Sequence, residues 1–188
     1  VALSVAVLTP ALAFALAGAG GSLAALSAAV PLAVSGLVVG TGLFILINPV
    51  LAPSVVALPV TALLNTFVAV PFALRVVGPA LRDVELGYGA LADSLGLTGV
   101  SRLWIVPVPR MRRALGFAAG LAGAMAVGDL GVIVLFAGTG QETLPLLMYR
   151  LMGAYRMEAA ASVALVLLAT SLVTFWVFDR GGRSDADA

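Results

Sequence analysis

Residues 87–113 read "GYGALADSLGLTGVSRLWIVPVPRMRR" and stand apart from the rest of a strongly apolar chain. This stretch collects glycines, polar side chains and arginines, whereas 62% of the 188 residues are hydrophobic and only 10% are charged. So apolar a composition, with so few charges, is typical of a membrane protein. The sequence therefore predicts an all-α integral membrane helical bundle in which residues 87–113 form a loop outside the lipid.

The residue types that are absent exclude several kinds of chemistry. The chain has no cysteine, no histidine and no lysine. Disulfides, thiolate or imidazole metal sites and nucleophile pairs that depend on histidine are therefore excluded, as is the lysine of a phosphate-binding loop. We expect no cofactor, no bound metal and no enzymatic activity in this chain, and its net charge of +1 gives no sign of a nucleic-acid partner.

Five apolar stretches approach the length of about 20 residues that a membrane-spanning helix needs. They are Val1–Leu16, Val30–Ile47, Val55–Val77, Leu115–Ala137 and Ala159–Phe178. Residues 1–178 are accordingly predicted to form one transmembrane domain. Within it, residues 139–156 form a loop with a short helix, and the polar residues 179–188 form a disordered tail.

The arginines predict the orientation of these spans. With five spans, eight arginines fall on one side of the membrane: Arg75, Arg82, Arg102, Arg110, Arg112, Arg113, Arg180 and Arg183. Only Arg150 and Arg156 fall on the other side. Because short cytoplasmic loops are rich in basic residues, we expect loop 87–113 and the tail in the cytoplasm and the N-terminus outside.

The first part of loop 87–113 has the spacing of a short amphipathic helix. Leucines and a tyrosine share one face, namely Tyr88, Leu91, Leu95 and Leu97. Asp93 and Ser94 lie across from them, and Gly96 and Gly99 end the pattern. One interpretation is a helix that lies in the lipid interface. The other is an element that docks on a partner protein.

The spacing within this loop resembles the EAA loop of ABC importer permeases, in which Glu-Ala-Ala, three residues, Gly, nine residues and Ile-x-Leu-Pro follow one another. Here Ala90, Leu91 and Ala92 stand first, Gly96 follows, and Val106 to Pro109 close the pattern. Ala90 replaces the family's Glu, and Val108 replaces its Leu. The resemblance implies a cytoplasmic coupling helix that contacts an ATPase subunit through Ala90, Leu91, Ala92, Asp93, Gly96, Val106 and Pro109.

The likeness covers nearly the whole chain in collinear order. The segments "VVGTGLFILIN" (38–48), "NTFVAVPFALRVV" (65–77), "GDLGVIVLF" (128–136) and "TLPLLMYRLMGAYRMEAAASVALVLL" (143–168), together with the loop, resemble the C-terminal half of thiamine ABC transporter permeases. This resemblance implies a type I importer fold in a bacterial inner membrane. It also implies cytoplasmic ABC ATPase subunits, a periplasmic substrate-binding protein and a second permease half, either fused or supplied by a homodimer.

A few polar residues inside the predicted spans are candidates for the transport pathway. Asp129 is an acid well inside a predicted span, where a carboxylate is costly unless it faces a cavity or a partner. Asn65 and Thr66 are candidates for lining the pore. For each of them, a hydrogen bond that stabilises helix packing is the competing interpretation. Gly116 and Gly120 have the spacing of a close helix contact.

Other functions remain open from the sequence. A permease for iron(III), sulfate or a polyamine shares the fold and the loop. An ion-coupled secondary carrier would need more intramembrane charges than Asp129 supplies. A membrane scaffold without transport activity would have no effect on an ATPase.

Overall fold

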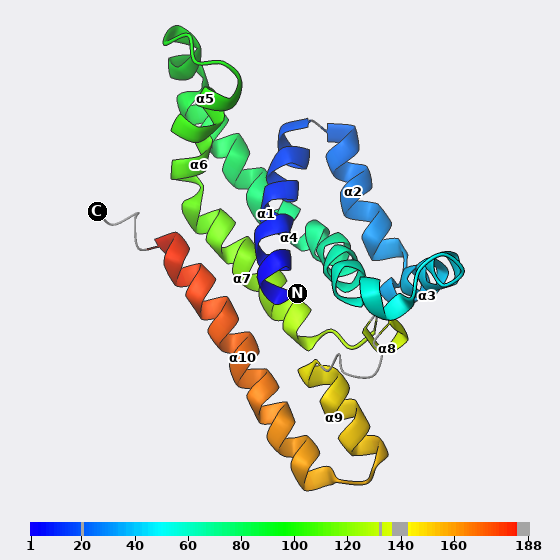
Figure 1. Ribbon diagram of the computed structural model, residues 1–188. Coiled ribbons are helices and arrows are strands. Elements are labelled where there is room, and N and C mark those ends of the chain that lie inside the picture. The colour runs from blue at the N-terminus through cyan, green and yellow to red at the C-terminus, as the bar shows by residue number, and fades with distance from the viewer. Residues whose placement is uncertain (20, 132, 137–142, 184–188) are drawn as a thin grey trace.

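The computed structural model describes residues 1–19, 21–131, 133–136 and 143–183, and within these ranges the regular structure is helical (Figure 1). The all-α prediction is therefore confirmed. The helices are α1 (Ala2–Ala19), α2 (Gly21–Ala33), α3 (Gly36–Ile47), α4 (Pro53–Ser94), α5 (Gly99–Ile105), α6 (Pro107–Arg110), α7 (Arg112–Gly128), α8 (Ile133–Phe136), α9 (Leu144–Gly153) and α10 (Met157–Arg183).

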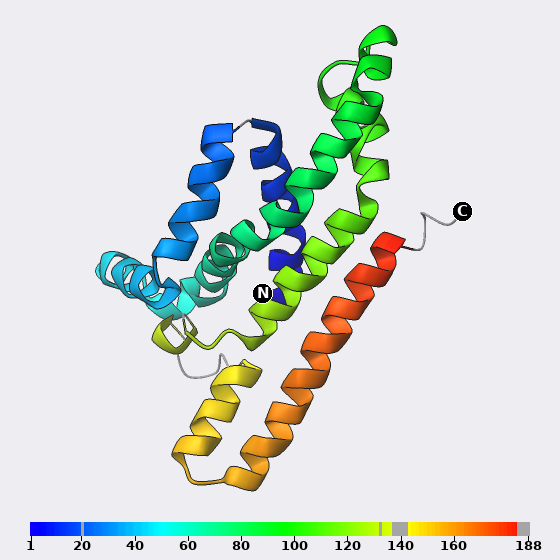
Figure 2. The same ribbon diagram turned by 180° about the vertical axis from the view of Figure 1, so that it is seen from behind.

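The long helices run side by side between the two ends of the bundle. In Figures 1 and 2, α1, α4 and α10 run toward the end where α5 lies, and α2 and α7 run back toward the end where α8 and α9 lie. The closest packing joins α10 to α7, α1 to α4 and α1 to α7. Successive passes of the chain therefore alternate in direction.

Three helices are individually long and apolar enough to cross a membrane: Ala2–Ala19, Val55–Ser94 and Met157–Arg183. A fourth candidate is the pair Ala25–Ala33 and Gly36–Ile47, which is bent by 85°. The predicted span 30–47 is thus not one straight helix. Ser35 separates the two parts, with extended backbone angles (φ −69°, ψ 129°).

The remaining predicted span, 115–137, is also shorter than expected. Helix α7 contains 17 residues and ends at Gly128, because Asp129 adopts an extended conformation (φ −74°, ψ 122°). Asp129 therefore caps a helix, which corrects its placement inside a span. At about 1.5 Å per residue, α7 is roughly 25 Å long, slightly less than the hydrocarbon thickness of about 30 Å.

Helices α9 and α10 form a hairpin at the C-terminal end of the chain, and its short helix was predicted better than its last turn. Helix α9 forms within residues 139–156, as expected, although residues 139–142 lie outside the described part of the chain. Helix α10 continues to Arg183, so residues 179–183 are helical and not disordered. Two contacts hold this last turn. Gly182 packs against the backbone of α7, and Arg183 forms an ion pair of 2.8 Å with Asp179, one turn earlier. Residues 184–188 of the predicted tail lie outside the described residues.

Helix α4 is the longest element, with 42 residues and three internal prolines at positions 59, 71 and 79. Proline removes one helical hydrogen bond, and neighbouring helices tolerate it in membranes when they cover the freed carbonyl. Here α1 and α2 pack along α4. The largest core cluster lies on this helix and includes Val70, Leu74, Val77 and Leu81, with Ala13 of α1.

Helices α7 and α10 approach each other through glycine. A Cβ atom at Gly120 would lie 2.8 Å from the carbonyl oxygen of Phe175, and one at Gly116 would lie 2.7 Å from that of Phe178. On the facing helix, a Cβ at Gly182 would lie 2.6 Å from the carbonyl oxygen of Arg112. The predicted close contact at Gly116 and Gly120 is confirmed, and it brings the end of α10 beside the loop that precedes α7.

This contact also places two arginine groups at one end of the bundle. Arg113 from the start of α7 and Arg183 from the end of α10 line the same cavity, together with Asp179. Arg150 and Arg156 lie in and just after α9, at the other end (Figure 1). The asymmetry that the sequence predicted is therefore present in the fold.

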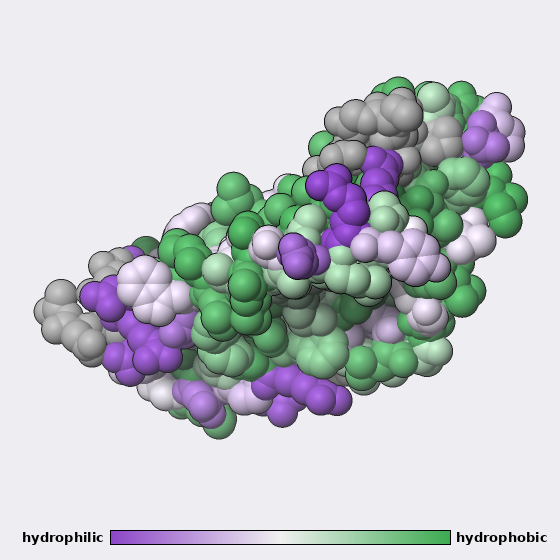
Figure 3. Space-filling model, turned by 90° about the horizontal axis from the view of Figure 1, so that it is seen from below, coloured by the Kyte–Doolittle hydropathy of each residue, from purple (hydrophilic) through white to green (hydrophobic). Residues whose placement is uncertain are grey.

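The outer surface is apolar over large areas. The face seen in Figure 3 is mostly hydrophobic, and hydrophilic side chains gather in separate patches. Exposed large side chains on α10 include Leu165, Leu172, Val173 and Trp176. Water does not favour so much exposed apolar surface, so lipid or other protein must cover these faces. The chain is a multi-pass membrane protein.

The close contact of α7 and α10 gives a stability prediction. We expect Gly120→Ala to destabilise the fold by about 1–3 kcal/mol, because its new Cβ meets backbone that must move. Unfolding of the purified protein by a denaturing detergent measures the change. Gly42→Ala is the matched control, since a Cβ at Gly42 in α3 meets nothing within 4 Å. Equal stability of both variants would contradict this packing.

Candidate functional site

Most of the EAA-like positions lie at the end of α4 and in the turn that follows it. Val106 and Pro109 lie further along, at the start of α6 and within it. The expected short separate helix is instead the last part of α4, which runs unbroken from the apolar core to Ser94. The prediction was wrong here because the residues between Val77 and Ala90 do not end the helix: Pro79 and the glycines at 78, 87 and 89 all lie within it. The loop is thus continuous with a membrane-spanning segment.

Gly96 ends α4 in a defined turn. The N–H of Gly96 donates to the carbonyl of Asp93 (3.0 Å), and the N–H of Leu97 donates to that of Ala92 (3.0 Å). These are the two hydrogen bonds of a Schellman motif, whose residue after the cap has a left-handed conformation. Gly96 has φ 67°, which explains why this position favours glycine. The spacing from Ala92 to Gly96 is therefore the spacing of this cap.

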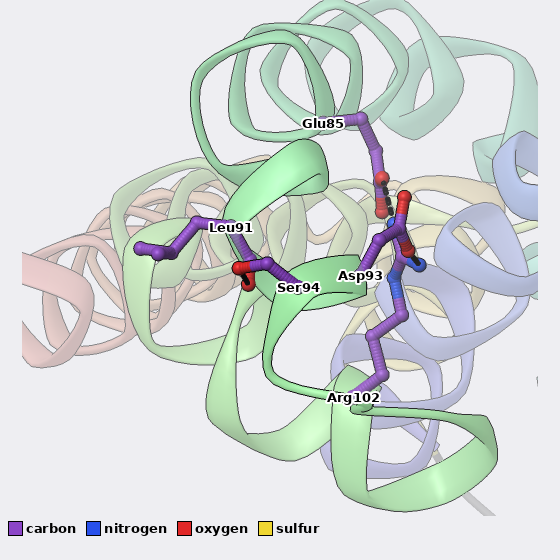
Figure 4. Close-up of polar contacts among 5 residues, drawn as sticks. All are labelled: Glu85, Leu91, Asp93, Ser94 and Arg102. Atoms are coloured by element: carbon purple, nitrogen blue, oxygen red, sulfur yellow. Dashed lines mark hydrogen bonds and ion pairs between the residues drawn. The ribbon is translucent and has the colours of Figure 1, made fainter.

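A charged cluster fastens the chain that returns from this turn, as Figure 4 shows. Arg102 of α5 donates to the carboxylate of Asp93 at 2.5 Å and to that of Glu85 at 2.7 Å. Gly89 leaves room for this contact, because a Cβ there would lie 3.3 Å from Glu85 Oε2 and 3.7 Å from Arg102 Nη2. We call Arg102, Glu85 and Asp93 the arginine clamp.

The clamp is electrostatically stable at neutral pH. Hydrogen bonds from Arg102 to Glu85 first, and then to Asp93, raise the pKa of the guanidinium above its ordinary value. Arg102 therefore stays charged throughout the accessible pH range. Exposed ion pairs stabilise a protein only modestly, so we assign the clamp to fixing the geometry of the loop.

Two further contacts hold the second half of the loop against α4. The guanidinium of Arg110 lies 4.1 Å from the ring centroid of Tyr88. Val106 and Met111 are buried in the core cluster that contains Ala92. Of the EAA-like positions, Ala92 and Val106 therefore face the interior, while Pro109 is exposed.

The remaining positions present an apolar face to the outside. The side chain of Leu91 is 55% exposed and that of Leu95 is 65% exposed. Figure 4 shows Leu91 pointing away from the clamp. Ala90, Asp93 and Gly96 are exposed as well. The face that sequence reasoning expected to be apolar is thus uncovered within the described part of the chain, at the tip of the molecule. We call Leu91 and Leu95 the tip leucines.

The pathway candidates separate into two places. Asn65 of α4 and Asp129 line one cavity of about 320 Å³ beside Gly128, Met125 and Ala126 of α7. Thr66 lines a different cavity, and its hydroxyl donates to the carbonyl of Ala62 (2.8 Å). The structure therefore brings Asn65 and Asp129 together and leaves Thr66 apart from them.

The cavity between Asn65 and Asp129 has unmet hydrogen-bonding capacity. The amide nitrogen of Asn65 and the second carboxylate oxygen of Asp129 are buried and have no hydrogen-bond partner among the residues that the structure describes. The first oxygen of Asp129 accepts from the N–H of Gly131 (3.1 Å). Because a buried unpaired polar group costs about 1–3 kcal/mol, this donor and this acceptor favour a polar or cationic guest.

Sequence reasoning missed the arginine clamp. It assigned Arg102 to the general excess of basic residues and gave Glu85 no role. The two residues are 17 positions apart, on helices joined by a turn, so no periodic pattern relates them. The sequence feature that could have indicated the clamp is the pair of glycines at 96 and 99. Both have positive φ angles in the structure (67° and 60°), and together they reverse the direction of the chain.

Comparison with known proteins shows relatives over most of the chain, although no protein-family model matches it. The thiamine transport system permease protein ThiP of Salmonella typhimurium is 36% identical over 155 residues, which is 82% of this chain and 29% of that protein. The Escherichia coli protein of the same name is 35% identical over 149 residues, covering 79% and 28%. Sulfate permease 2 of Chlamydomonas reinhardtii, a chloroplast protein, is 31% identical over 122 residues, covering 63% and 33%.

These matches cover about four-fifths of this chain, yet the chain spans less than a third of the length of the thiamine permeases it matches. The resemblance that the sequence suggested is thereby confirmed. Over about four-fifths of its own length, this chain is related to the thiamine transport permeases and corresponds to one segment of them.

Proposed function

We propose that this chain forms part of the translocation pathway of an ATP-driven importer for thiamine or its phosphates in a bacterial inner membrane. The observation that carries this proposal is the similarity to thiamine transport permeases over 79–82% of the chain. The unmatched two thirds or more of those relatives leaves room for a second permease half, either fused to this segment or supplied by another copy.

In this proposal, the loop at the end of α4 couples the permease to a cytoplasmic ATPase. Three features support a docking role over a helix lying in lipid. The tip leucines are exposed at the point of the molecule farthest along α4 (Figure 1). The clamp gives the loop a fixed shape, and the unbroken α4 joins it to the membrane segment. A movement of the tip is therefore passed directly to the membrane-spanning part of α4.

The cavity of Asn65 and Asp129 supports a cationic cargo. Asp129 at the end of α7 lines this cavity together with Asn65, and one of its carboxylate oxygens is buried and unpaired within the described residues. A buried carboxylate in a membrane protein is costly unless it faces a cavity or a partner. Thiamine carries a positively charged thiazolium ring, whereas sulfate, the cargo named for the chloroplast relative, is repelled by a carboxylate.

The end of the bundle near α9 would face a periplasmic substrate-binding protein. Arg150 and Arg156 lie there, and the turn between α9 and α10 projects beyond the other helices (Figure 1). Acidic residues on a binding protein would complement this end. An ion-coupled carrier is disfavoured by comparison, since it gives the arginine clamp and the tip leucines no role.

The docking role makes a direct prediction. We expect the double variant Leu91→Ala, Leu95→Ala to weaken binding of the ATPase subunit at least about tenfold, because burying one leucine contributes about 1.5–3 kcal/mol. Binding of purified ATPase to the permease in lipid nanodiscs measures this. The variant should keep its thermal stability, since both side chains are largely exposed.

A matched control separates docking from a general effect on surface leucines. The pair Leu165→Ala, Leu172→Ala removes the same number of exposed leucines from α10 and should leave ATPase binding unchanged. If the tip variant binds the ATPase as tightly as the unaltered protein does, the loop is not the docking element.

The pathway role makes a second prediction. We expect Asp129→Asn to lower the uptake of radiolabelled thiamine at least about tenfold, because a charge-assisted contact contributes about 1.5–3 kcal/mol. Glu158→Gln, which also removes one carboxylate but lies outside the cavity, should transport normally. Unchanged uptake by the Asp129 variant, at equal protein level, would exclude the cavity from the pathway. Uptake of sulfate in place of thiamine by the unaltered protein would contradict the proposal that thiamine is the cargo.

A further inference from the structure

A groove runs along α1, α2 and α4, and it is distinct from the cavity of Asn65 and Asp129. One part, of about 750 Å³, is lined almost entirely by apolar residues, among them Leu8, Leu12, Leu63 and Phe67. The other part, of about 710 Å³, is lined by small residues of α1 and α2 and by charged residues of α4.

The two parts adjoin on all three helices. Leu16 lines the apolar part and the next residue, Ala17, lines the charged part. The same change occurs between Ser27 and Ala28 on α2 and between Val70 and Pro71 on α4. The groove is therefore continuous, with an apolar section and a charged section in series along the bundle.

The length of α4 sets the depth of each section. The stretch from Val55 to Leu74 is about 20 residues, or roughly 30 Å of helix, which matches the hydrocarbon thickness of a bilayer. The apolar section, which ends at Val70, then lies within the hydrocarbon. Arg75 falls at its edge, and Arg82 lies about 10 Å further along the helix axis, at the level of lipid headgroups on the side of the loop.

The charged section is cationic. Arg75 and Arg82 both line it, and being seven residues apart they project from the same side of α4. Within the described residues, neither guanidinium has an ion-pair partner. Glu85 also lines this section, but its carboxylate is held by Arg102 at 2.7 Å. The groove therefore has a positively charged section directly beside its apolar section.

We propose that this groove binds one anionic phospholipid from the leaflet on the side of the loop. An acyl chain occupies the apolar section, and the phosphate group lies against Arg75 and Arg82. Guanidinium groups bind phosphate through charge-assisted hydrogen bonds, and basic pockets between membrane helices bind anionic headgroups. A protein helix inserted into the same groove would leave these two charges without a partner, so the lipid is the better match.

The site does not depend on the cargo or on the ATPase. The residues that line the groove include neither of the tip leucines and do not include Asp129. Failure of the transport proposal would leave it standing, and its own failure would leave the transport proposal standing.

The test uses the permease complex purified through a tag on this chain, together with the subunits that accompany it in its membrane. Native mass spectrometry after exchange into mixed micelles of phosphatidylglycerol and phosphatidylcholine counts the bound lipid. We expect one tightly held phosphatidylglycerol per chain. The double variant Arg75→Gln, Arg82→Gln should retain it at least about tenfold less, whereas Arg156→Gln, at the other end of the bundle, should retain it fully.

A second variant tests the apolar section. Ala11 lines the apolar section, so the Ala11→Trp variant would place a large ring there. This variant should also retain less lipid. Glycerol phosphate, which has the anionic group without acyl chains, should not displace the lipid.

Four results would overturn the proposal. The first is that the unaltered complex retains no phosphatidylglycerol, which would indicate that another protein segment fills the groove. The second is an equal loss of lipid in the Arg156→Gln control, and the third is unchanged retention in Ala11→Trp. The fourth is displacement of the lipid by glycerol phosphate, which would indicate a site for free anions.

Discussion

The continuity of helix α4 is the feature on which the rest of the structure depends. A single helix of 42 residues crosses the apolar core and continues to the tip of the loop. Its three internal prolines each remove one backbone hydrogen bond, yet none of them ends the helix. The tip and Asn65 therefore belong to one continuous helix.

Two devices at the end of α4 turn this continuity into a defined shape. The Schellman cap at Gly96 stops the helix and reverses the chain. The arginine clamp then holds the returning segment to the same helix, 2.5 Å from Asp93 and 2.7 Å from Glu85. At its other side, the chain continues into α7, which is fixed against α10 by glycine contacts near Gly116 and Gly182. The loop is therefore braced on two long helices.

The features that follow from short-range patterns could be predicted from the sequence. Apolar length identified Ala2–Ala19, Val55–Ser94 and Met157–Arg183, which are long and apolar enough to span a membrane, whereas the other two predicted spans are bent or short. The family spacing that located the loop coincides, from Ala92 to Gly96, with the fixed spacing of a helix cap. The arginine clamp could not be predicted, since Glu85 and Arg102 meet only after the chain reverses. The end of α7 at Gly128 was also missed, because an apolar run around Asp129 gives no local signal for the extended conformation that breaks it. The pairing of Asn65 with Asp129 in one cavity depends on how α4 packs against α7, which residue periodicity does not specify.

The central claim is that the tip of α4 contacts an ATPase, and the absence of cysteine from the chain allows it to be tested directly. A single Leu95→Cys variant, assembled with its ATPase in native membranes, is labelled with a maleimide–benzophenone crosslinker and irradiated, and the products are identified by mass spectrometry. The photoreactive end inserts into C–H bonds, so the crosslink needs no thiol on the ATPase. The account predicts a crosslink between position 95 and the ATPase, and none from Leu165→Cys on the exposed face of α10. Absence of the crosslink at position 95, or equal crosslinking from position 165, would contradict it.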